Sequence, residues 1–398
     1  MAELNPAPAS ATRRLPPLPD GLWRVMLGTT CVVLSFSLLN PVLAVRLQMS
    51  GASSTAIGLF ATLPFVAVAA LVPLVPRLFG RIGVGQAYRL GLLLELIACL
   101  GYLLTDDYRL WCALGLMAGL GAAAAWNATE ALIAHNVPAS HRGRLTGLYQ
   151  ALLGAAMAVG PMLPRLLGLD PQQANGVAAG GLTLGLILTL APAVARLKAM
   201  HDDHEPMGLM AAWRFRPTLA WAAVVGGVFE VGLGSITTAY GSQIGLDLGR
   251  ATSIAGALGL GSFALQYPIG WLADHLPPRR LFAAGAGLLV LSALAFVEAA
   301  NHPTLLWVCA GLWGGVGGAL YTLSMIRVAH DFADSSALAG TSAMIAGYTA
   351  GGALGPIVSG WVFDHHGVVG QGLWLAVLAL SLLLMQLRPS APGSATTG

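Results

Sequence analysis

Twelve apolar runs follow one another along this chain, with only short polar stretches between them. An α-helix rises 1.5 Å per residue, so a run of about 20 residues crosses the roughly 30 Å hydrocarbon core of a bilayer. Only 9% of the 398 residues are charged, against roughly 25% in a typical soluble domain, so the chain cannot cover itself with polar surface. The pattern predicts an all-α integral membrane protein whose main solvent is the lipid bilayer.

The apolar runs fall into two sets of six, separated by the longest polar stretch. We expect spans near 22–46, 54–79, 87–105, 109–135, 144–168 and 174–197, and then near 217–245, 250–275, 280–300, 304–330, 336–363 and 370–388. The expected organisation is an N-terminal six-helix bundle at 22–197, a cytosolic linker at 198–216 and a C-terminal bundle at 217–388, with cytosolic tails at 1–21 (disordered) and 389–398.

The basic residues indicate the orientation in the membrane. If both termini are cytosolic, all 20 Lys and Arg residues lie in or near cytosolic connections except Arg46, Arg109, Arg165 and Arg250. Because basic residues concentrate on the cytosolic side of membrane proteins, we expect both termini in the cytosol and a multi-pass location in the cell inner (cytoplasmic) membrane. No basic stripe interleaved with aromatic residues is present, so the charge does not indicate a nucleic-acid partner.

The two sets are repeats of each other. Gly160-Pro161 in the fifth span recurs as Gly355-Pro356 in the eleventh, and glycines of the fourth span recur in the tenth: Gly115, Gly119 and Gly121 correspond to Gly311, Gly315 and Gly317. The duplication predicts two six-helix bundles related by a pseudo-two-fold axis. Parallel repeats of this kind occur in secondary transporters, whose halves move about a site near the middle of the bilayer. We therefore expect transport of a small-molecule solute.

The most specific motif follows the eighth span. It runs from Gly270 through Asp274 to the pair Arg279 and Arg280. This loop resembles the signature loop of the major facilitator superfamily, in which a Gly, an Asp four residues later and two basic residues join neighbouring helices on the cytosolic side. The resemblance implies the superfamily fold, transport by alternating access and a conformational latch in this loop. The alternative is an ordinary capped, solvated loop that obeys the positive-inside rule.

Further segments resemble one branch of that superfamily, the YcaD-like transporters. They are the run from Trp126 to Leu132, the Arg142-to-Leu145 segment, Leu320-Tyr321 and Gly355-Pro356. The first-half loop departs from the superfamily pattern, because Gly80 stands where its acidic residue is expected. We therefore expect the acidic latch only in the second half.

Two carboxyl groups within the spans are candidates for proton coupling. An ionisable side chain in hydrocarbon costs about 2.5–3.5 kcal/mol on insertion scales and usually faces a cavity or a partner. Glu230 lies near the middle of the seventh span and is the first candidate, because it could gain and lose a proton as a cavity opens to each side. Glu95 in the third span is the second. The alternative for Glu230 is a permanent hydrogen bond to a neighbouring span.

Glu130 and Arg327 are the expected gate. They lie at similar depths in the fourth and tenth spans, which the superfamily resemblance places along the central cavity together with the first and seventh. The pair could meet across the two halves and close the cytosolic side. Pairs within one half, such as Glu130 with Arg81 or Arg144, are equally compatible with the sequence.

The solute site should combine aromatic walls with a few polar groups. Our candidates on the lining spans are Asn40, Trp126, Asn127, Phe229, Tyr240 and Tyr321, with Gln150, Gln266 and Tyr348 as weaker additions. Each aromatic residue could instead pack against a helix or lipid. An aromatic, apolar cavity with one central acid suits an amphiphilic organic molecule better than a sugar or phosphate.

Other classes of function fit less well. No ATP-binding motif, cofactor motif or nucleophile–base constellation is present, so we expect neither an enzyme nor a bound cofactor. The cluster from His201 to Glu205 lies in the linker and is expected to be solvated rather than a metal site. The glycines and proline of the fifth span weakly resemble those of proton antiporters, so proton-coupled export by a monomer is the leading expectation. Proton-coupled uptake and a non-transporting membrane sensor are the alternatives.

Overall fold

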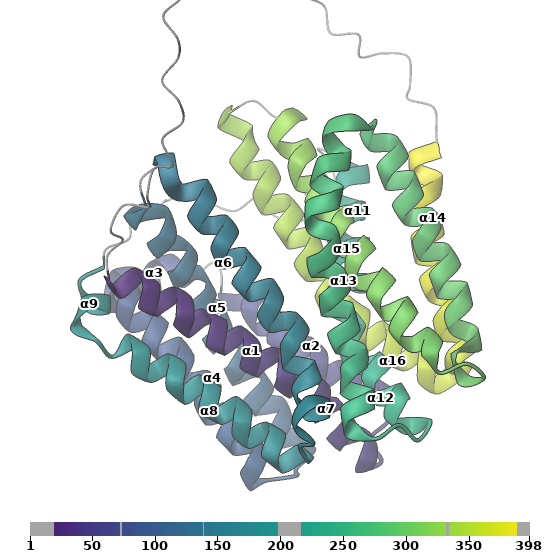
Figure 1. Ribbon diagram of the computed structural model, residues 1–398, viewed down its shortest axis with the longest axis horizontal. Helices are drawn as coiled ribbons and strands as arrows, with labels where there is room; N and C mark the ends of the chain where they lie inside the picture. The colour runs from purple at the N-terminus through teal and green to yellow at the C-terminus, as the bar shows by residue number, and fades with distance from the viewer. Residues whose placement is uncertain (1–19, 72–73, 138, 198–215, 332–333, 388–398) are drawn as a thin grey trace, which may run out of the picture.

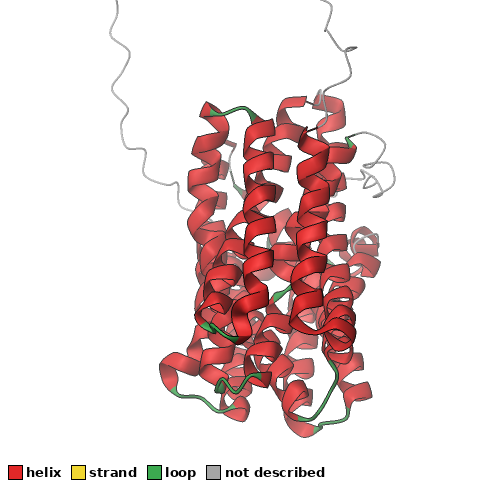
Figure 2. Ribbon diagram, turned by 90° about the vertical axis from the view of Figure 1, so that its right-hand side faces the viewer, coloured by secondary structure: helices red, strands yellow, loops and turns green. Residues whose placement is uncertain are grey.

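The computed structural model describes residues 20–71, 74–137, 139–197, 216–331 and 334–387. These residues form helices and short connections, without strands (Figure 2). The expected tail at 389–398, most of the tail at 1–21 and most of the linker at 198–216, including the cluster from His201 to Glu205, lie outside the described residues. The boundaries of the domains therefore stay predictions.

The first half forms one bundle, which lies on the left in Figure 1. Its main helices are α1 (Asp20–Met49), α2 (Ser54–Leu71), α3 (Val75–Ile82), α4 (Val84–Leu104), α5 (Tyr108–Asn136), α6 (Ala139–Val159), α7 (Leu163–Leu167), α8 (Pro171–Thr189) and α9 (Pro192–Ala195). A 3₁₀ turn at Gly160–Met162 joins α6 to α7. The expected fifth span is thus one path of helix with a break at the glycine-proline pair.

The second half forms the other bundle, on the right in Figure 1. Its helices are α11 (Pro217–Gly227), α12 (Gly234–Gln243), α13 (Leu248–His275), α14 (Pro278–Phe296), α15 (Thr304–Asp331) and α16 (Asp334–Leu387). A π-helical segment, Val228–Gly232, connects α11 to α12. Helix α16 is two helices separated by a kink at Gly367, where φ is 63°.

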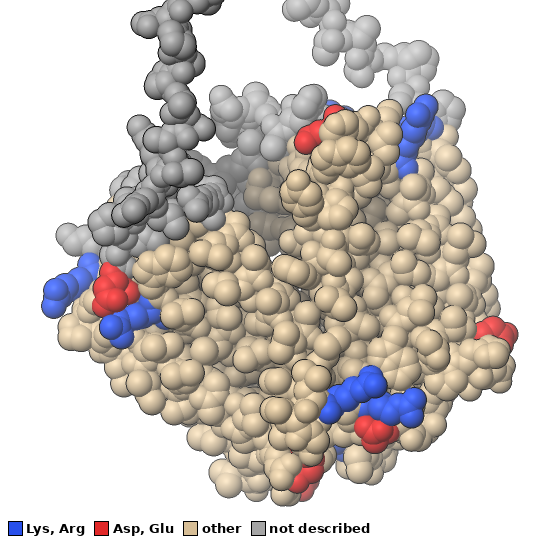
Figure 3. All heavy atoms as spheres, viewed as in Figure 1, with Lys and Arg blue, Asp and Glu red and all other residues tan. Residues whose placement is uncertain are grey.

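The helices account for the expected twelve crossings. Nine stretches of the described chain are long and apolar enough to span a membrane, and one of them, Ala343–Leu387, contains both helices of α16. The two remaining crossings are α8 and α13, which have the length of a span. Charged side chains on the face in Figure 3 lie near helix ends and leave a broad uncharged middle. The prediction of an all-α protein with two six-helix bundles is confirmed.

Close approach of glycines joins helices within each bundle. A Cβ placed on Gly261 of α13 would lie 1.9 Å from the carbonyl oxygen of Gly311 on α15. In the first half, a Cβ on Gly121 of α5 would lie 2.5 Å from the carbonyl oxygen of Gly91 on α4. Small residues let membrane helices pack backbone against backbone, which matters because lipid supplies no hydrophobic drive for helix association.

The two halves touch mainly near one face, which we call the seam face. It lies opposite the terminal face, where α1 begins and α16 ends. At the seam face α1 contacts α12, α2 contacts α16, and α6 and α7 contact α13. A Cβ on Gly58 would lie 2.2 Å from the carbonyl oxygen of Pro356, and one on Gly259 would lie 2.7 Å from that of Met157. Toward the terminal face the halves separate, and Figure 3 shows a hollow between them.

Candidate functional site

Glu230 is a buried carboxyl group enclosed within the second half. It lies in the π-helical segment and is 8% exposed. Its Oε1 accepts a hydrogen bond of 2.5 Å from the hydroxyl of Ser262 on α13, and its Oε2 accepts one of 2.8 Å from the hydroxyl of Tyr348 on α16. A π-helical turn redirects the side chains of a helix and often occurs at functional sites. The segment thus aims a carboxylate between two neighbouring helices.

A glycine of a third helix makes room for this carboxylate. A Cβ on Gly318 of α15 would lie only 2.7 Å from Oε1 of Glu230. A Cβ on the neighbouring Gly317 would lie 2.9 Å from the backbone nitrogen of Glu230. Helices α13, α15 and α16 therefore enclose the Glu230 carboxylate, and α15 can approach it because two glycines face it.

Tyr348 connects Glu230 to a second tyrosine. The rings of Tyr348 and Tyr321 lie 4.5 Å apart between centroids, at an interplanar angle of 41°. Tyr321 lies on α15, the helix whose glycines face Glu230. The two tyrosines thus form a row that begins at the buried carboxylate.

The sequence predicted Glu230 as a residue for proton coupling and Tyr348 as a weaker candidate for solute contact. It did not predict that Ser262 and Gly318 belong to this site. Serine is common in membrane helices and Gly318 lies in a run of glycines, so neither residue stands out by type. Their role depends on which helices pack together, and one sequence alone does not give that pairing. Ser262 could have been predicted only if the eighth span had been known to pack against the seventh, because it would then be a polar residue facing Glu230.

Glu130 and Arg327, the expected gate residues, do not form an ion pair with each other in this conformation. Oε1 of Glu130 accepts a 2.8 Å hydrogen bond from the indole nitrogen of Trp126, one turn earlier in α5. The ion pairs found among the described residues do not include Glu130 with Arg327. Because the halves are separated toward the terminal face, where both residues lie, a direct contact between them would require that face to close.

Glu95 is a second buried carboxyl group, in the first half. It is 6% exposed, and its Oε1 has no hydrogen-bond partner among the described residues. It faces α5, where a Cβ on Gly121 would lie 3.0 Å from its Cγ. Glu95 thus meets a glycine of the fourth span much as Glu230 meets glycines of the tenth, but without the hydroxyl donors that hold Glu230.

The candidate solute residues lie in two environments. Asn40 and Tyr240 lie at the seam face: Oδ1 of Asn40 accepts a 2.6 Å hydrogen bond from Ser235 across the halves, and Tyr240 packs 4.9 Å from the ring of Phe363. Phe229 is fully buried against Trp313 inside the second half, so it could contact a solute only after a rearrangement.

The other candidates lie farther from the seam face. Trp126 is 40% exposed, Gln150 is exposed, and Asn127 and Tyr321 are half-buried. The amide of Asn127 donates to the carbonyl oxygen of Ala123 in its own helix. These four side chains remain candidates for solute contact in this conformation.

The signature loop lies between α13 and α14. Arg279 donates to the carbonyl oxygens of Gln386 and Leu387 at the end of α16, where a cation complements the negative end of the helix dipole. Asp274 at the end of α13 and Arg280 are exposed, and the segment from Gly270 to Asp274 continues α13. In this conformation Arg279 ties the loop to the last helix of its own half.

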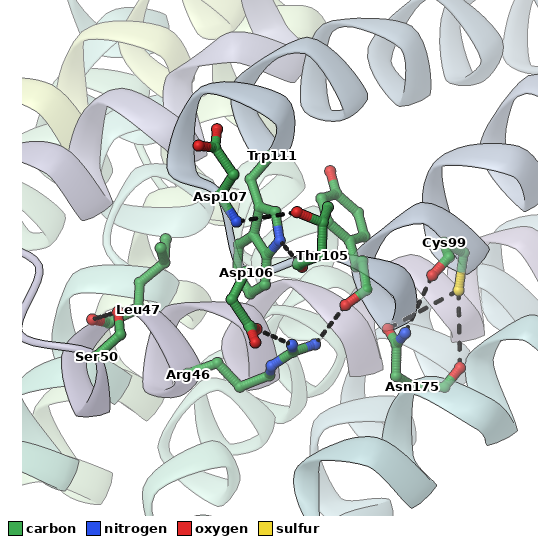
Figure 4. Close-up of polar contacts among 10 residues, drawn as sticks. Arg46, Leu47, Ser50, Cys99, Thr105, Asp106, Asp107, Trp111 and Asn175 are labelled. Carbon is green, nitrogen blue, oxygen red and sulfur yellow. Dashed lines mark hydrogen bonds and ion pairs between the residues drawn. The ribbon is translucent and has the colours of Figure 1, made fainter.

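At the seam face, Arg46 ties together elements of the first half (Figure 4). It donates to the carbonyl oxygen of Tyr102 over 2.8 Å and to the carboxylate of Asp106 over 2.7 Å. Its guanidinium lies 4.6 Å from the ring centroid of Trp111. These partners lie within its own half, so Arg46 fixes the end of α1 against the α4–α5 connection.

Comparison with protein families agrees with this architecture. The profile described as Major Facilitator Superfamily matches residues 25–262 and 219–396. An uncharacterised MFS-type transporter YfkF of Bacillus subtilis (strain 168) is 22% identical over 338 residues, covering 82% of this chain and 84% of the relative. The uncharacterised MFS-type transporter YcaD of Shigella flexneri is 22% identical over 369 residues, covering 91% and 94%. The expected resemblance to the YcaD-like branch is confirmed.

Solved structures share the fold at low sequence identity. The crystal structure of the nucleoside transporter NupG has a TM-score of 0.73 at 12% identity and covers 93% of this chain and 100% of that one. A D-xylose-proton symporter has a TM-score of 0.73 at 11% identity, covering 92% and 96%. A bacterial homologue of the lysosomal transporter Spinster, in an inward-facing and unoccupied conformation, has a TM-score of 0.69 at 15% identity, covering 92% and 94%.

Proposed function

Because the chain belongs to the Major Facilitator Superfamily and is a secondary transporter of a small solute, we propose that it couples solute movement to protons through Glu230. The observation that supports the proposal is the enclosed carboxylate with its two hydroxyl donors. We place the protein in the cell inner membrane with both termini cytosolic, exporting an amphiphilic organic solute as a monomer.

The hydrogen bonds of Glu230 link its protonation to helix packing. An ionised carboxylate only accepts hydrogen bonds, so it can satisfy both Ser262 and Tyr348 at once. A protonated carboxyl donates through one oxygen, and its remaining bonds lose the strength that the charge supplied. Protonation therefore weakens or rearranges the contacts that join the π-helical segment to α13 and α16.

These same helices form the seam between the halves. Helix α12, which follows the π-helical segment, contacts α1, while α13 contacts α6 and α16 contacts α2. A change at Glu230 thus acts on three helices that hold the seam face closed. In this proposal, Glu230 links proton binding to alternating access.

The remaining candidate residues complete the proposal. Trp126, Asn127, Gln150 and Tyr321 would contact the solute from the space between the halves. Glu130 and Arg327 would approach each other when the terminal face closes. Glu95 would be a secondary protonation site, since it is buried without the donors that Glu230 has.

The experiment uses the purified protein in proteoliposomes with an imposed pH gradient. Fluorescent and radiolabelled amphiphilic cations, such as ethidium and tetraphenylphosphonium, are the first probes, followed by neutral metabolites. We expect gradient-driven movement of at least one probe, and its loss in Glu230→Gln. The matched control is Glu298→Gln, because Glu298 is an exposed carboxylate near a helix end that accepts a hydrogen bond from Asn301.

The outcomes separate the alternatives. Gradient-driven transport by Glu230→Gln at the rate of Glu298→Gln would remove Glu230 from coupling. Accumulation of the probe on the opposite side to that expected for antiport would favour proton-coupled uptake. A sensor that keeps the fold would bind probes without moving any of them.

A further inference from the structure

A carboxylate of the second half caps a helix of the first half at the seam face. Oδ1 of Asp364 on α16 accepts a 2.8 Å hydrogen bond from the backbone nitrogen of Ser54. Its Oδ2 accepts bonds of 2.7 Å from the backbone nitrogen of Thr55 and 2.6 Å from the hydroxyl of Thr55. Ser54 and Thr55 begin α2, so the carboxylate lies at the positive end of that helix.

This cap completes the first turn of α2. The first N–H groups of a helix have no partner within the helix and must be satisfied from outside. The hydroxyl of Ser53 accepts from the nitrogen of Ala56, as a helix cap from the same chain segment does. The nitrogens of Ser54 and Thr55 depend instead on Asp364, about 310 residues later.

Other carboxylates at the seam face cap their own helices. Asp107, Asp170 and Asp247 each precede the helix they cap and accept a bond from its third residue. Such a cap is independent of how the two halves are arranged. The Asp364 cap exists only while α16 of one half lies against α2 of the other.

Close packing and a cavity accompany the cap. A Cβ on Gly360 would lie 2.2 Å from the carbonyl oxygen of Ser54, and the hydroxyl of Thr62 donates over 2.7 Å to the carbonyl oxygen of Ala353. Beside the cap lies a cavity of about 230 Å³ whose lining comes from both halves and includes Asp364, Ser54 and Gln243. Its lining also includes buried residues such as Ala239, which is 5% exposed, and these become fully accessible from the seam face only if α2 and α16 part.

We propose that Asp364 is a latch that holds the seam face closed by capping α2, and that its release admits solute to or from this cavity. The proposal rests on alternating access, as the proposed function does, but not on protons or Glu230. Charge-assisted bonds to a helix N-terminus are strong enough to bias the two conformations. They also break as a unit, because all three partners belong to the start of α2.

The test measures access to the cavity without any transported solute. Ala239, a cavity-lining residue that is 5% exposed, is replaced by Cys in a background without the four native cysteines, and a membrane-impermeant maleimide is added to intact vesicles from the seam side. We expect Asp364→Ala to raise the labelling rate about tenfold, since hydrogen bonds to a charged group are lost. Thr55→Val, which removes one of the three bonds and keeps the shape, should raise it about threefold.

The control is Asp247→Ala, which removes the cap of α13 within one half at the same face. Its labelling rate should equal that of the parent. Equal labelling rates for Asp364→Ala, Thr55→Val and Asp247→Ala would overturn the latch. If Asp364→Ala does not fold, the comparison of Thr55→Val with Asp247→Ala is the test. A failure of proton-driven transport with the labelling difference intact would refute the proposed coupling and leave the latch standing.

Discussion

Replacing Gly318 by Ala perturbs the Glu230 site while every ionisable residue stays in place. The new methyl carbon would lie 2.7 Å from Oε1 and 3.0 Å from Cδ of Glu230, well inside ordinary contact distance. The carboxylate must move, and Oε1 is the atom that accepts from Ser262. Loss of a hydrogen bond to a charged group costs about 1.5–3 kcal/mol.

The magnitude follows from a comparison with a second glycine. Gly→Ala inside a helix stabilises by up to about 1 kcal/mol when the methyl group finds space. Gly287 on α14 offers that space, because no atom of the described residues lies within 4 Å of a Cβ there. Gly318→Ala and Gly287→Ala should therefore differ by about 1.5–3 kcal/mol in free energy of unfolding, with Gly318→Ala the less stable.

The assay is equilibrium unfolding of both variants in detergent, in the parent and in a Glu230→Ala background. Removal of the carboxyl group relieves the clash, so the difference between the two glycine variants should disappear in that background. If Gly318→Ala and Gly287→Ala unfold alike in the parent, the described enclosure of Glu230 by α15 is wrong.

Three further predictions concern other residues. Tyr348→Phe removes one donor to Glu230 and should reduce proton-driven transport roughly tenfold, measured as initial rate in proteoliposomes, while binding of the solute changes less. Glu130→Arg and Arg327→Glu should each lower transport, and the double variant should recover it; no recovery would rule out a direct gate pair. Arg46→Ala should lower the free energy of unfolding by about 1–2 kcal/mol, because a hydrogen-bonded ion pair and a cation–π contact are lost together. The exposed ion pair of Arg24 with Asp20 provides the comparison. Arg24→Ala should lower the free energy of unfolding by less than about 1 kcal/mol.

Most of the fold could be predicted from the sequence because hydropathy and helix length are local properties. The apolar runs located twelve crossings, and the recurrence of Gly160-Pro161 as Gly355-Pro356 indicated the duplication. The breaks inside the crossings could not be predicted in the same way. The π-helical segment at Val228–Gly232 and the kink at Gly367 depend on neighbouring helices, which the sequence does not identify.

A site residue could be predicted from the sequence where placing its side chain in the membrane costs free energy whatever its neighbours are. Glu230 and Glu95 stand out because a carboxyl group in an apolar span is energetically costly and usually has a partner or faces a cavity. Asp364 did not stand out, because it follows an expected span and a charge there is ordinary. Its bonds to Ser54 and Thr55 depend on contact between segments about 310 residues apart.

Proton movement driven by the solute tests the central proposal most directly. Proteoliposomes with a pH-sensitive dye inside are given a solute gradient and no pH gradient, using a probe that the screen has identified. A coupled transporter should change the internal pH in wild type and not in Glu230→Gln, while Glu230→Gln still exchanges labelled for unlabelled probe. An equal pH change in wild type and Glu230→Gln would contradict the role of Glu230.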